Sequence, residues 1–209
     1  TFTLLFVHDI AFTHGFILLL AALTMIIGVL GAIAQNHFKR ILSYHIISQI
    51  GYMILGLGLY TPLALAGAIF YIIHHIIVKT ALFLVSGIVE RTTGTQQLRH
   101  MGGLLNTYPW VATLFLLAAL SLAGMPPFSG FFAKLALLTA GVQAEQYVYV
   151  GVALLGSLLT LVSMSKIYVY VFWGEEKPNH APPVRHMDLL LPTAFLVSFT
   201  VGLGLVGEP

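Results

Sequence analysis

Long apolar segments constrain this chain more than any other feature of its sequence. A helix that crosses the roughly 30 Å hydrocarbon core of a bilayer needs about 20 mostly apolar residues. Segments that meet this requirement cover residues 14–34, 41–59, 63–89, 109–141, 147–173 and 189–205. Charged residues make up only 8% of the chain, whereas a soluble domain carries about 25%. The sequence therefore predicts an all-α, polytopic membrane helical bundle of about six spans, forming a single membrane domain over residues 1–209.

The short loops predict how these spans are oriented. Basic residues gather in alternate loops, which contain Lys39, Arg40, Arg91, Arg99, His100, Lys177 and Arg185. The intervening loops, residues 58–62 and 143–146, contain no Lys or Arg. Because Lys and Arg accumulate in cytoplasmic loops, we expect a multi-pass protein of a bacterial or archaeal cell membrane, with its basic loops on the cytoplasmic side.

Composition and motifs exclude several other functions. A net charge of +2 provides no broad basic surface for nucleic acid. The absence of cysteine excludes disulfides, thiolate metal sites and Cys nucleophiles. No Gly-rich phosphate loop, HExxH or GxSxG motif occurs. Haem ligation by His45 and His75 is disfavoured by the neighbouring lysines. We therefore predict neither a cofactor nor a resident metal.

The third apolar segment carries polar side chains that do not belong in lipid. Its polar members, which fall within about 140° of one helix face, are Tyr71, His74, His75, Lys79 and Ser86. His75 and Lys79 lie one helical turn apart. A buried lysine without an anion is poorly solvated when charged and can exchange its proton. These residues predict a proton path; the alternative is that Lys79 pairs with a carboxylate and serves packing only.

The fourth apolar segment is interrupted by two consecutive prolines, Pro126 and Pro127, which follow Met125. Each half is too short for a full crossing, so we predict one span broken at this point. Proline lacks a backbone donor, and free carbonyls at membrane depth are tolerated only inside protein or beside a wet cavity. Broken helices of transporters are typical ion sites. Lys134 follows the break and is predicted to exchange protons there; a simple hinge with a snorkelling lysine is the alternative.

A second polar face lies on the second segment and the turn before it. Its members are His37, Arg40, Tyr44, His45, Ser48, Gln49 and Tyr52. This face could line a file of water, or it could form hydrogen bonds between helices. Lys166, with Ser163 and Thr160 before it, could extend the polar stripe or snorkel to the basic side. Glu90 and Arg91 are expected only to cap the end of the third segment.

Several stretches resemble the antiporter-like membrane subunits shared by Mrp-type multisubunit Na+/H+ antiporters and respiratory complex I. They are GAIAQNHFKRILSYHIISQIGYM (31–53), HHIIVKTALFLVSGIVER (74–91), LRHMGGL (98–104) and AGMPPFSGFFAKLAL (123–137). Within that superfamily, QNHFKRILSYHIISQIGYMILGLGL, IHHIIVKTALF and VFWGEEK are most similar to the D-type subunits of Mrp antiporters.

The resemblance implies a particular set of relay residues. In that family, five-helix repeats of inverted orientation hold a row of buried lysines and histidines that carry protons. The family's linking lysine falls on Lys39, its His-x3-Lys helix on His75 and Lys79, and its broken-helix lysine on Lys134. From pattern alone, Lys39 points away from the polar face of its segment and could be a simple loop lysine.

The resemblance also implies that the chain is a fragment. It starts at Thr1 with neither an initiator Met nor a signal peptide, and it would correspond to part of the second repeat and the helices after it. The family's glutamate and lysine of the first repeat would then precede Thr1. A Na+ site is not evident, since no buried carboxylate suited to a hard cation occurs in the spans.

The implied function is proton translocation in a subunit of a multisubunit Na+/H+ antiporter, a transporter and not an enzyme. Its partners would be other membrane subunits of the same complex, protons, Na+ and the lipid bilayer. Two alternatives remain. One is a proton-pumping subunit of NADH:quinone oxidoreductase or of a membrane-bound hydrogenase; the other is a non-conducting scaffold subunit.

Overall fold

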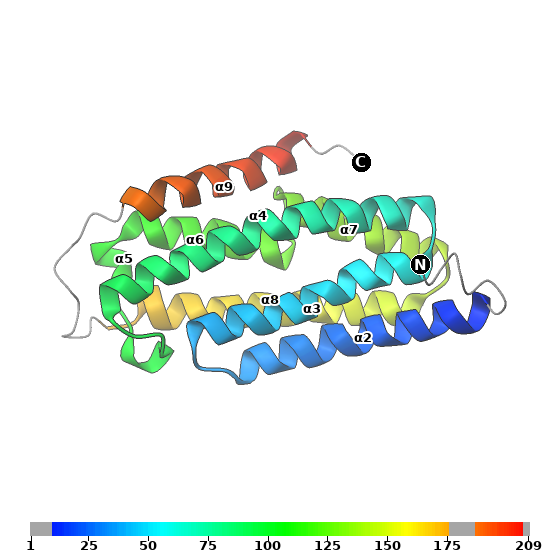
Figure 1. Cartoon of the computed structure of the whole chain (residues 1–209), viewed down its shortest axis with the longest axis horizontal. Helices are drawn as coiled ribbons and strands as arrows, with labels where there is room; N and C mark the ends of the chain where they lie inside the picture. Colours follow the sequence, from blue (N-terminus) through cyan, green and yellow to red (C-terminus); the bar gives the residue numbers. More distant parts are fainter. Residues whose placement is uncertain (1–9, 176–186, 207–209) are drawn as a thin grey trace.

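The computed structural model describes residues 10–175 and 187–206 and contains long, nearly parallel helices (Figure 1). The basic loop residues Lys177 and Arg185 lie outside the described residues. The elements are α2 (Ile10–Ala34), α3 (Phe38–Leu59), α4 (Pro62–Thr93), η1 (Leu98–His100), α5 (Leu104–Thr107), α6 (Pro109–Ala123), α7 (Ser129–Gln143), α8 (Tyr147–Tyr168), the π-helical turn η2 (Val169–Trp173) and α9 (Met187–Val206).

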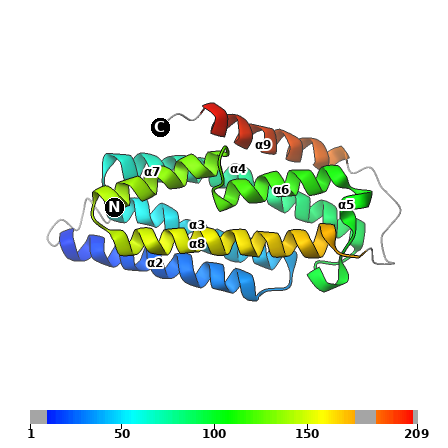
Figure 2. The same cartoon turned by 180° about the vertical axis from the view of Figure 1, so that it is seen from behind.

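These elements confirm the predicted all-α membrane bundle. Among the described residues, five helices are long and apolar enough to cross a membrane, and α6 is a shorter apolar helix. The predicted break is also confirmed, because α6 ends at Ala123 and α7 begins at Ser129. The two half-helices follow one another in line in both views of the bundle (Figures 1 and 2).

Local sequence signals set the ends of the longest helix, α4. Pro62 occupies the first turn, where its missing donor is not needed. The Thr61 hydroxyl accepts a hydrogen bond from the Ala64 amide at 3.1 Å and caps the start. The helix ends at Gly94, whose φ of +68° suits glycine. At 32 residues, α4 is about 48 Å long at 1.5 Å per residue, so it extends beyond the hydrocarbon core.

The helices pack so that α4 lies at the centre of the bundle. It contacts α3, α6, α7 and α9, while α8 packs against α2, α3, α6 and α7. In Figure 1, α9 lies along one edge of the bundle and α2 along the opposite edge. Every helix that carries a candidate site residue therefore borders the interior.

Two apolar clusters occupy the two ends of this interior. The basic-end cluster includes Leu42, Val78, Leu122 and Met164. The opposite cluster includes Tyr52, Tyr71, Ala133 and Ala153. In each of the helices α3, α4, α6–α7 and α8, the residues between these positions are near the midpoint of the span. The bundle thus leaves a layer at mid-membrane depth that neither apolar cluster fills.

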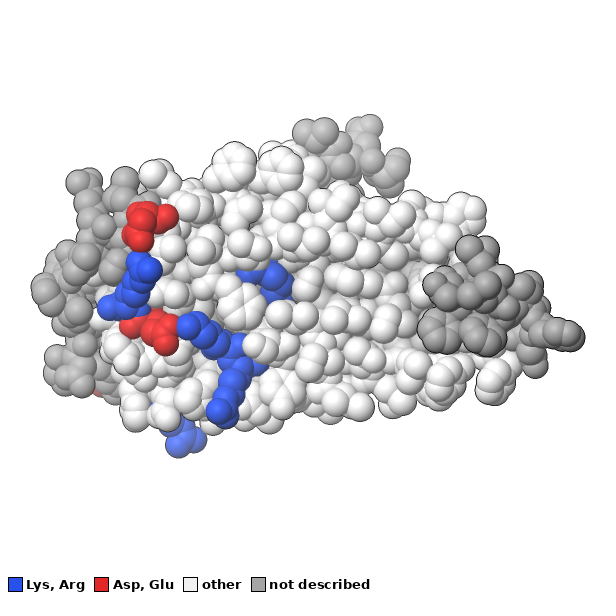
Figure 3. Space-filling model, viewed as in Figure 1, with Lys and Arg blue, Asp and Glu red and all other residues white. Residues whose placement is uncertain are grey.

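The exposed basic residues within the described part of the chain gather toward one end of the bundle. The turn before α3 and the segment after α4 are joined there by backbone hydrogen bonds, from Phe38 to Gln96 and from Leu98 to Asn36. Figure 3 shows most of the exposed Lys and Arg atoms toward that end. The grouping agrees with the loop pattern, while the side of the membrane that this end faces stays a prediction.

Candidate functional site

Polar side chains fill the mid-depth layer between the two apolar clusters. Those buried there are His45, Ser48, Gln49, His74, His75, Lys79, Ser129, Lys134, Thr160 and Ser163. Lys79 and Lys134 are only 5% and 4% exposed, respectively. We call these ten residues the polar layer. Both lysines therefore lie inside protein and not at the lipid headgroups, as the sequence predicted.

The helix break explains how Lys134 is held. In an unbroken helix the carbonyls of Leu122 and Ala123 would accept from residues 126 and 127, but those residues are prolines without an amide hydrogen. The amine of Lys134 donates to both carbonyls, at 3.1 and 3.0 Å. The two prolines thus create the acceptors that hold Lys134.

Two further side chains complete the surroundings of Lys134. Its amine donates to the Ser157 hydroxyl at 3.0 Å and lies 4.7 Å from the centroid of the Tyr52 ring. The hydroxyl of Tyr52 lies 3.0 Å from that of Ser157 and donates to the Ala153 carbonyl at 2.6 Å. Neutral dipoles and an aromatic face therefore surround the amine.

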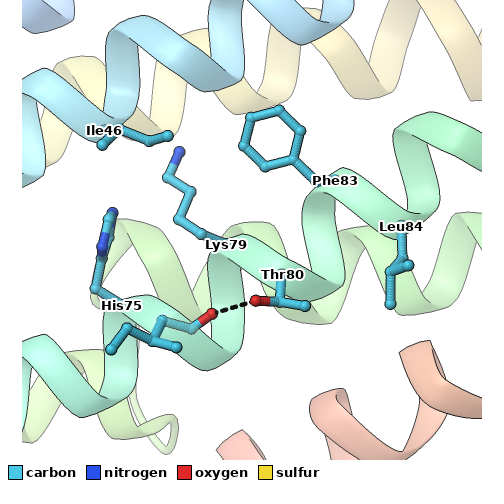
Figure 4. Close-up of a pocket in the computed structure, with 7 residues that line it drawn as sticks. Ile46, His75, Lys79, Thr80, Phe83 and Leu84 are labelled. Carbon is cyan, nitrogen blue, oxygen red and sulfur yellow. Dashed lines mark hydrogen bonds between the residues drawn. The ribbon is translucent and has the colours of Figure 1, made fainter.

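Lys79 lies at the other end of the polar layer. Its amine donates to the Leu42 carbonyl in α3 at 3.0 Å. Between α3 and α4 it also lines an open groove of about 500 Å³, with Ile46, His75, Ile76, Thr80, Phe83 and Leu84. In Figure 4 the Lys79 side chain extends toward Ile46 on α3, and His75 stands beside it. The groove leaves Lys79 accessible from one side.

Neither buried lysine has a carboxylate partner in the described part of the chain. The two ion pairs found there join Lys39 to Glu90 and Arg91 to Asp188. A charge held by carbonyls and hydroxyls alone is less well compensated than one paired with an anion. This arrangement disfavours the alternative of a packing ion pair at Lys79, while proton exchange by the two amines stays a prediction.

One face of α3 joins the two lysines. Leu42, which accepts from Lys79, and Tyr52, which faces Lys134, are ten residues apart, or about 15 Å along the helix. His45 and Gln49 lie between them on the same face. His45 is within Coulombic range of both lysines. Tyr71 donates to the Gln49 side-chain oxygen, and Gln49 donates to Thr160 at 3.4 Å.

The buried histidines each retain an unpartnered ring nitrogen. His45 Nε2 bonds Ser163 Oγ at 2.9 Å, and His74 Nδ1 bonds Ser129 Oγ at 2.8 Å. The other nitrogens of these two rings, and Nε2 of His75, have no partner among the described residues. A neutral imidazole can donate at one nitrogen and accept at the other, so these rings are suited to pass protons.

Other predicted residues lie outside the polar layer. Lys39, implied to be buried, is 46% exposed and paired with Glu90, which is 43% exposed. The view that Glu90 and Arg91 serve only as caps is therefore wrong, since both join separate helices. His37 precedes α3 at the basic end, half-buried beside Gln97.

Of the residues predicted to line a water path, some lie in the polar layer and others lie outside it. Tyr44 packs, half-buried, against the basic-end cluster. Lys166 does not enter the polar layer; its amine reaches the basic end, where it donates to the Ile33 and Gln35 carbonyls at 3.0 and 2.8 Å and caps the end of α2. His45, Ser48, Gln49 and His74 lie in the layer. The hydroxyl of Ser48 donates to the Met25 carbonyl at 2.9 Å, a bond between helices.

Three hydroxyl residues at the site were missed from the sequence, namely Ser121, Ser157 and Thr200. Ser157 shares a face with Thr160 and Ser163, three and six residues on, so extending that stripe by one turn would have found it. Ser121 and Thr200 lie in apolar helices that also carry other hydroxyl residues, such as Thr113 and Thr193, and no sequence signal singles them out. Within the described residues, no group of three or more His, Asp or Glu side chains could hold a metal.

The fold and the polar layer define a polytopic membrane protein with two buried lysines that have no carboxylate partner in the described part of the chain. Residues 1–160 match the family described as NADH:quinone oxidoreductase/Mrp antiporter, TM. The chain belongs to this family, which confirms the family predicted from its sequence.

Two similar proteins of this family are named as antiporter subunits. The chain is 58% identical to the D-type subunit of the Na(+)/H(+) antiporter of Alkalihalophilus pseudofirmus, over 100% of this chain and 43% of that protein. It is 42% identical to the protein of the same name from Bacillus subtilis, over 97% of this chain and 42% of that protein. It thus spans less than half the length of these relatives.

A solved structure agrees with these relatives. A chain in the Mrp complex from Dietzia sp. DQ12-45-1b superposes with a TM-score of 0.85 at 36% identity, covering 94% of this chain and 45% of that one. The similarity therefore extends to the arrangement of the helices in space.

Proposed function

We propose that this chain carries protons across the middle of the membrane within a subunit of a multisubunit Na+/H+ antiporter. The observation that carries the proposal is the pair of buried amines, Lys79 and Lys134, at the two ends of one polar face of α3, with no described carboxylate beside either. Such a pair can gain and lose protons without breaking an ion pair.

The proposed path runs between these lysines along the polar layer. Protons reach Lys79 and His75, which share the groove between α3 and α4. They pass His45 and Gln49, with water bridging the gaps, and leave from Lys134 at the helix break. Charge on one lysine raises the energy of charging the other, which couples the two sites electrostatically.

We also propose that Lys39 lies at the entrance to this path. The family's linking lysine falls on it, and we propose that it receives protons from the preceding half of the subunit. Its ion pair with Glu90 lies at the basic end of the bundle. We propose that this end faces the cytoplasm, because Lys and Arg accumulate in cytoplasmic loops.

The proposed partners follow from the same relatives. The similar sequences are named as D-type subunits of Na(+)/H(+) antiporters, and the superposed chain is part of a complex. We therefore propose that the chain works as part of a transporter and not as an enzyme, with other membrane subunits around it and Na+ as the exchanged cation. The family description also covers NADH:quinone oxidoreductase, so proton pumping in such a complex is the second candidate.

The test uses the full complex in everted membrane vesicles, with Na+-driven proton movement followed by a pH-sensitive dye. Lys79→Met and Lys134→Met keep an unbranched side chain, one atom shorter than lysine, and remove the exchangeable proton. We expect each to abolish Na+-dependent proton movement while the complex still assembles. Thr80→Val is the matched control, since Thr80 lines the same groove but bonds only to Ile76 in its own helix.

Two outcomes would count against this proposal. Near-normal transport by both lysine variants would remove the mechanism. Transport lost equally in Thr80→Val would mean that the groove is sensitive to any substitution and that Lys79 has no special part in it. Proton pumping driven by NADH, without Na+, would favour the second candidate.

A further inference from the structure

A chain of buried hydroxyls connects α9 to the helix break and ends on a histidine. Its members come from four helices: Ser121 on α6, Thr200 on α9, Ser129 on α7 and His74 on α4. Each side chain is at most 1% exposed. In Figure 2, α9 runs along the row formed by α6 and α7 and crosses their junction. The four side chains therefore meet where the broken span is covered.

The distances within this chain are those of hydrogen bonds. The Ser121 and Thr200 hydroxyl oxygens are 3.0 Å apart, and those of Thr200 and Ser129 are 2.6 Å apart. The Ser129 oxygen is 2.8 Å from His74 Nδ1. Three consecutive contacts therefore link α6 to the imidazole on α4.

The hydrogens of this chain can run in either of two directions. Each hydroxyl has one hydrogen to donate. If Ser121 donates to Thr200, Thr200 to Ser129 and Ser129 to His74 Nδ1, all three hydrogens are used. The imidazole hydrogen then lies on Nε2, which has no partner among the described residues. In the opposite direction it is the Ser121 hydrogen that has no acceptor in the described structure. Either direction leaves one donor unpartnered, and the two differ in whether that donor is the Ser121 hydroxyl or Nε2 of His74.

The Nε2 atom of His74 lies against the start of α7. A Cβ atom on Gly130 would be 2.8 Å from both Cε1 and Nε2 of His74, so glycine permits this approach. Gly130 lies one turn before Lys134 on the same face of α7. His74 is also within Coulombic range of Lys134, and its Nε2 has no partner among the described residues. A hydrogen on Nε2 would thus be presented toward the side of the break on which Lys134 lies.

We propose that Ser121, Thr200 and Ser129 hold His74 in the tautomer that carries its hydrogen on Nε2, and that Thr200 is the positioning residue that completes this chain. A donor on that side complements the neutral amine of Lys134 after its proton has left, and it does not complement the ammonium. The inference rests on the proposed function, since it concerns how Lys134 is prepared to pass on its proton.

The test compares two threonines of α9 in the full complex. Thr200→Val keeps the shape and removes the hydroxyl, and Thr200→Ser restores the hydroxyl without the methyl group. Thr193→Val is the matched control, because Thr193 is also buried but donates at 2.7 Å to Leu189 in its own helix. We expect Thr200→Val to slow Na+-dependent proton movement roughly three- to tenfold, the effect of losing one buried hydrogen bond. Thr200→Ser and Thr193→Val should stay near the wild type.

The opposite pattern would overturn the inference. If Thr200→Val transports normally, or if Thr200→Ser is slower than Thr200→Val, the residue serves packing and not the hydrogen-bonded chain. Normal transport by Lys79→Met and Lys134→Met would instead remove the proposed function, so the two failures are distinguishable. If Thr200→Val does not assemble, Ser129→Ala breaks the next contact and should give the same loss; normal transport in that variant would also overturn the inference.

A second measurement does not depend on transport. In complex labelled with ¹⁵N-histidine, the tautomer of each neutral imidazole is read from its ring nitrogen shifts. The His74 signal is assigned by its absence in His74→Ala. We expect it to show hydrogen on Nε2 in the wild type and a mixture of tautomers in Thr200→Val. A His74 signal with hydrogen on Nδ1 in the wild type, or one unchanged by Thr200→Val, would contradict the proposal.

Discussion

The amine of Lys134 lies 4.7 Å from the centroid of the Tyr52 ring, and both side chains contact the Ser157 hydroxyl. The aromatic ring therefore faces the amine while its hydroxyl is anchored to α8. An ammonium over an aromatic face is stabilised by about 0.5–2 kcal/mol. Tyr52 therefore contributes in two ways, through its ring face and through its hydroxyl, and substitutions can test each one separately.

Tyr52→Phe keeps the ring and removes the hydroxyl, whereas Tyr52→Leu removes both. We expect Tyr52→Phe to retain most of the transport rate and Tyr52→Leu to fall roughly three- to tenfold below it, because the hold on the charged amine weakens. The measurement is Na+-dependent proton movement per assembled complex. Equal rates in the two variants would show that the ring face has no part in holding Lys134.

The cap formed by Lys166 predicts a loss of stability without a loss of transport. Lys166→Met removes the donor to the Ile33 and Gln35 carbonyls at the end of α2. We expect the free energy of unfolding to fall by about 1–3 kcal/mol, since hydrogen bonds from a charged group are lost. Thermal unfolding of the purified complex measures the change. Lys166→Arg, which can still donate, serves as control, and transport lost in Lys166→Met with stability unchanged would return Lys166 to the proton path.

The exposed pair of Lys39 and Glu90 predicts different effects on stability and on transport. With side chains 46% and 43% exposed, the pair should contribute about 0–1 kcal/mol of coupling in a double-mutant cycle, and less at high salt. If Lys39 passes protons, Lys39→Met should slow transport several-fold more than Glu90→Gln. Equal losses in the two variants would mean that only the ion pair counts.

Gly124 and Gly151 predict opposite outcomes for the same substitution. Gly124 has a φ of +88°, and a Cβ atom there would lie 2.8 Å from Lys134 Cδ. Gly124→Ala should therefore destabilise the complex by about 1–2 kcal/mol and displace Lys134, so transport falls. A Cβ atom on Gly151 meets nothing within 4 Å, and Gly151→Ala in the interior of α8 should stabilise the helix by about 0.5–1 kcal/mol. Full transport by Gly124→Ala would contradict the tight placement of Lys134.

The fold was predictable because its strongest signals are local. Apolar length identifies a span, and the consecutive prolines mark the break from their missing donors alone, so α6 and α7 end and begin close to where the sequence placed them. The burial of Lys79, His75 and Lys134 followed from their positions inside such spans. Family resemblance added Lys39, which lies at the basic end of the bundle and outside the polar layer.

By itself the sequence determined which side chains must leave lipid, since a charged group within an apolar span has few places to go. Only the tertiary structure decided what each of them meets. Lys134 takes the two carbonyls freed by the prolines, Lys166 caps α2, and Thr200 reaches His74 through Ser129. Partners of this kind come from helices far apart in the chain, and many are backbone carbonyls or single hydroxyls. Such groups occur in every helix, so no pattern along the sequence distinguishes the ones that packing brings together.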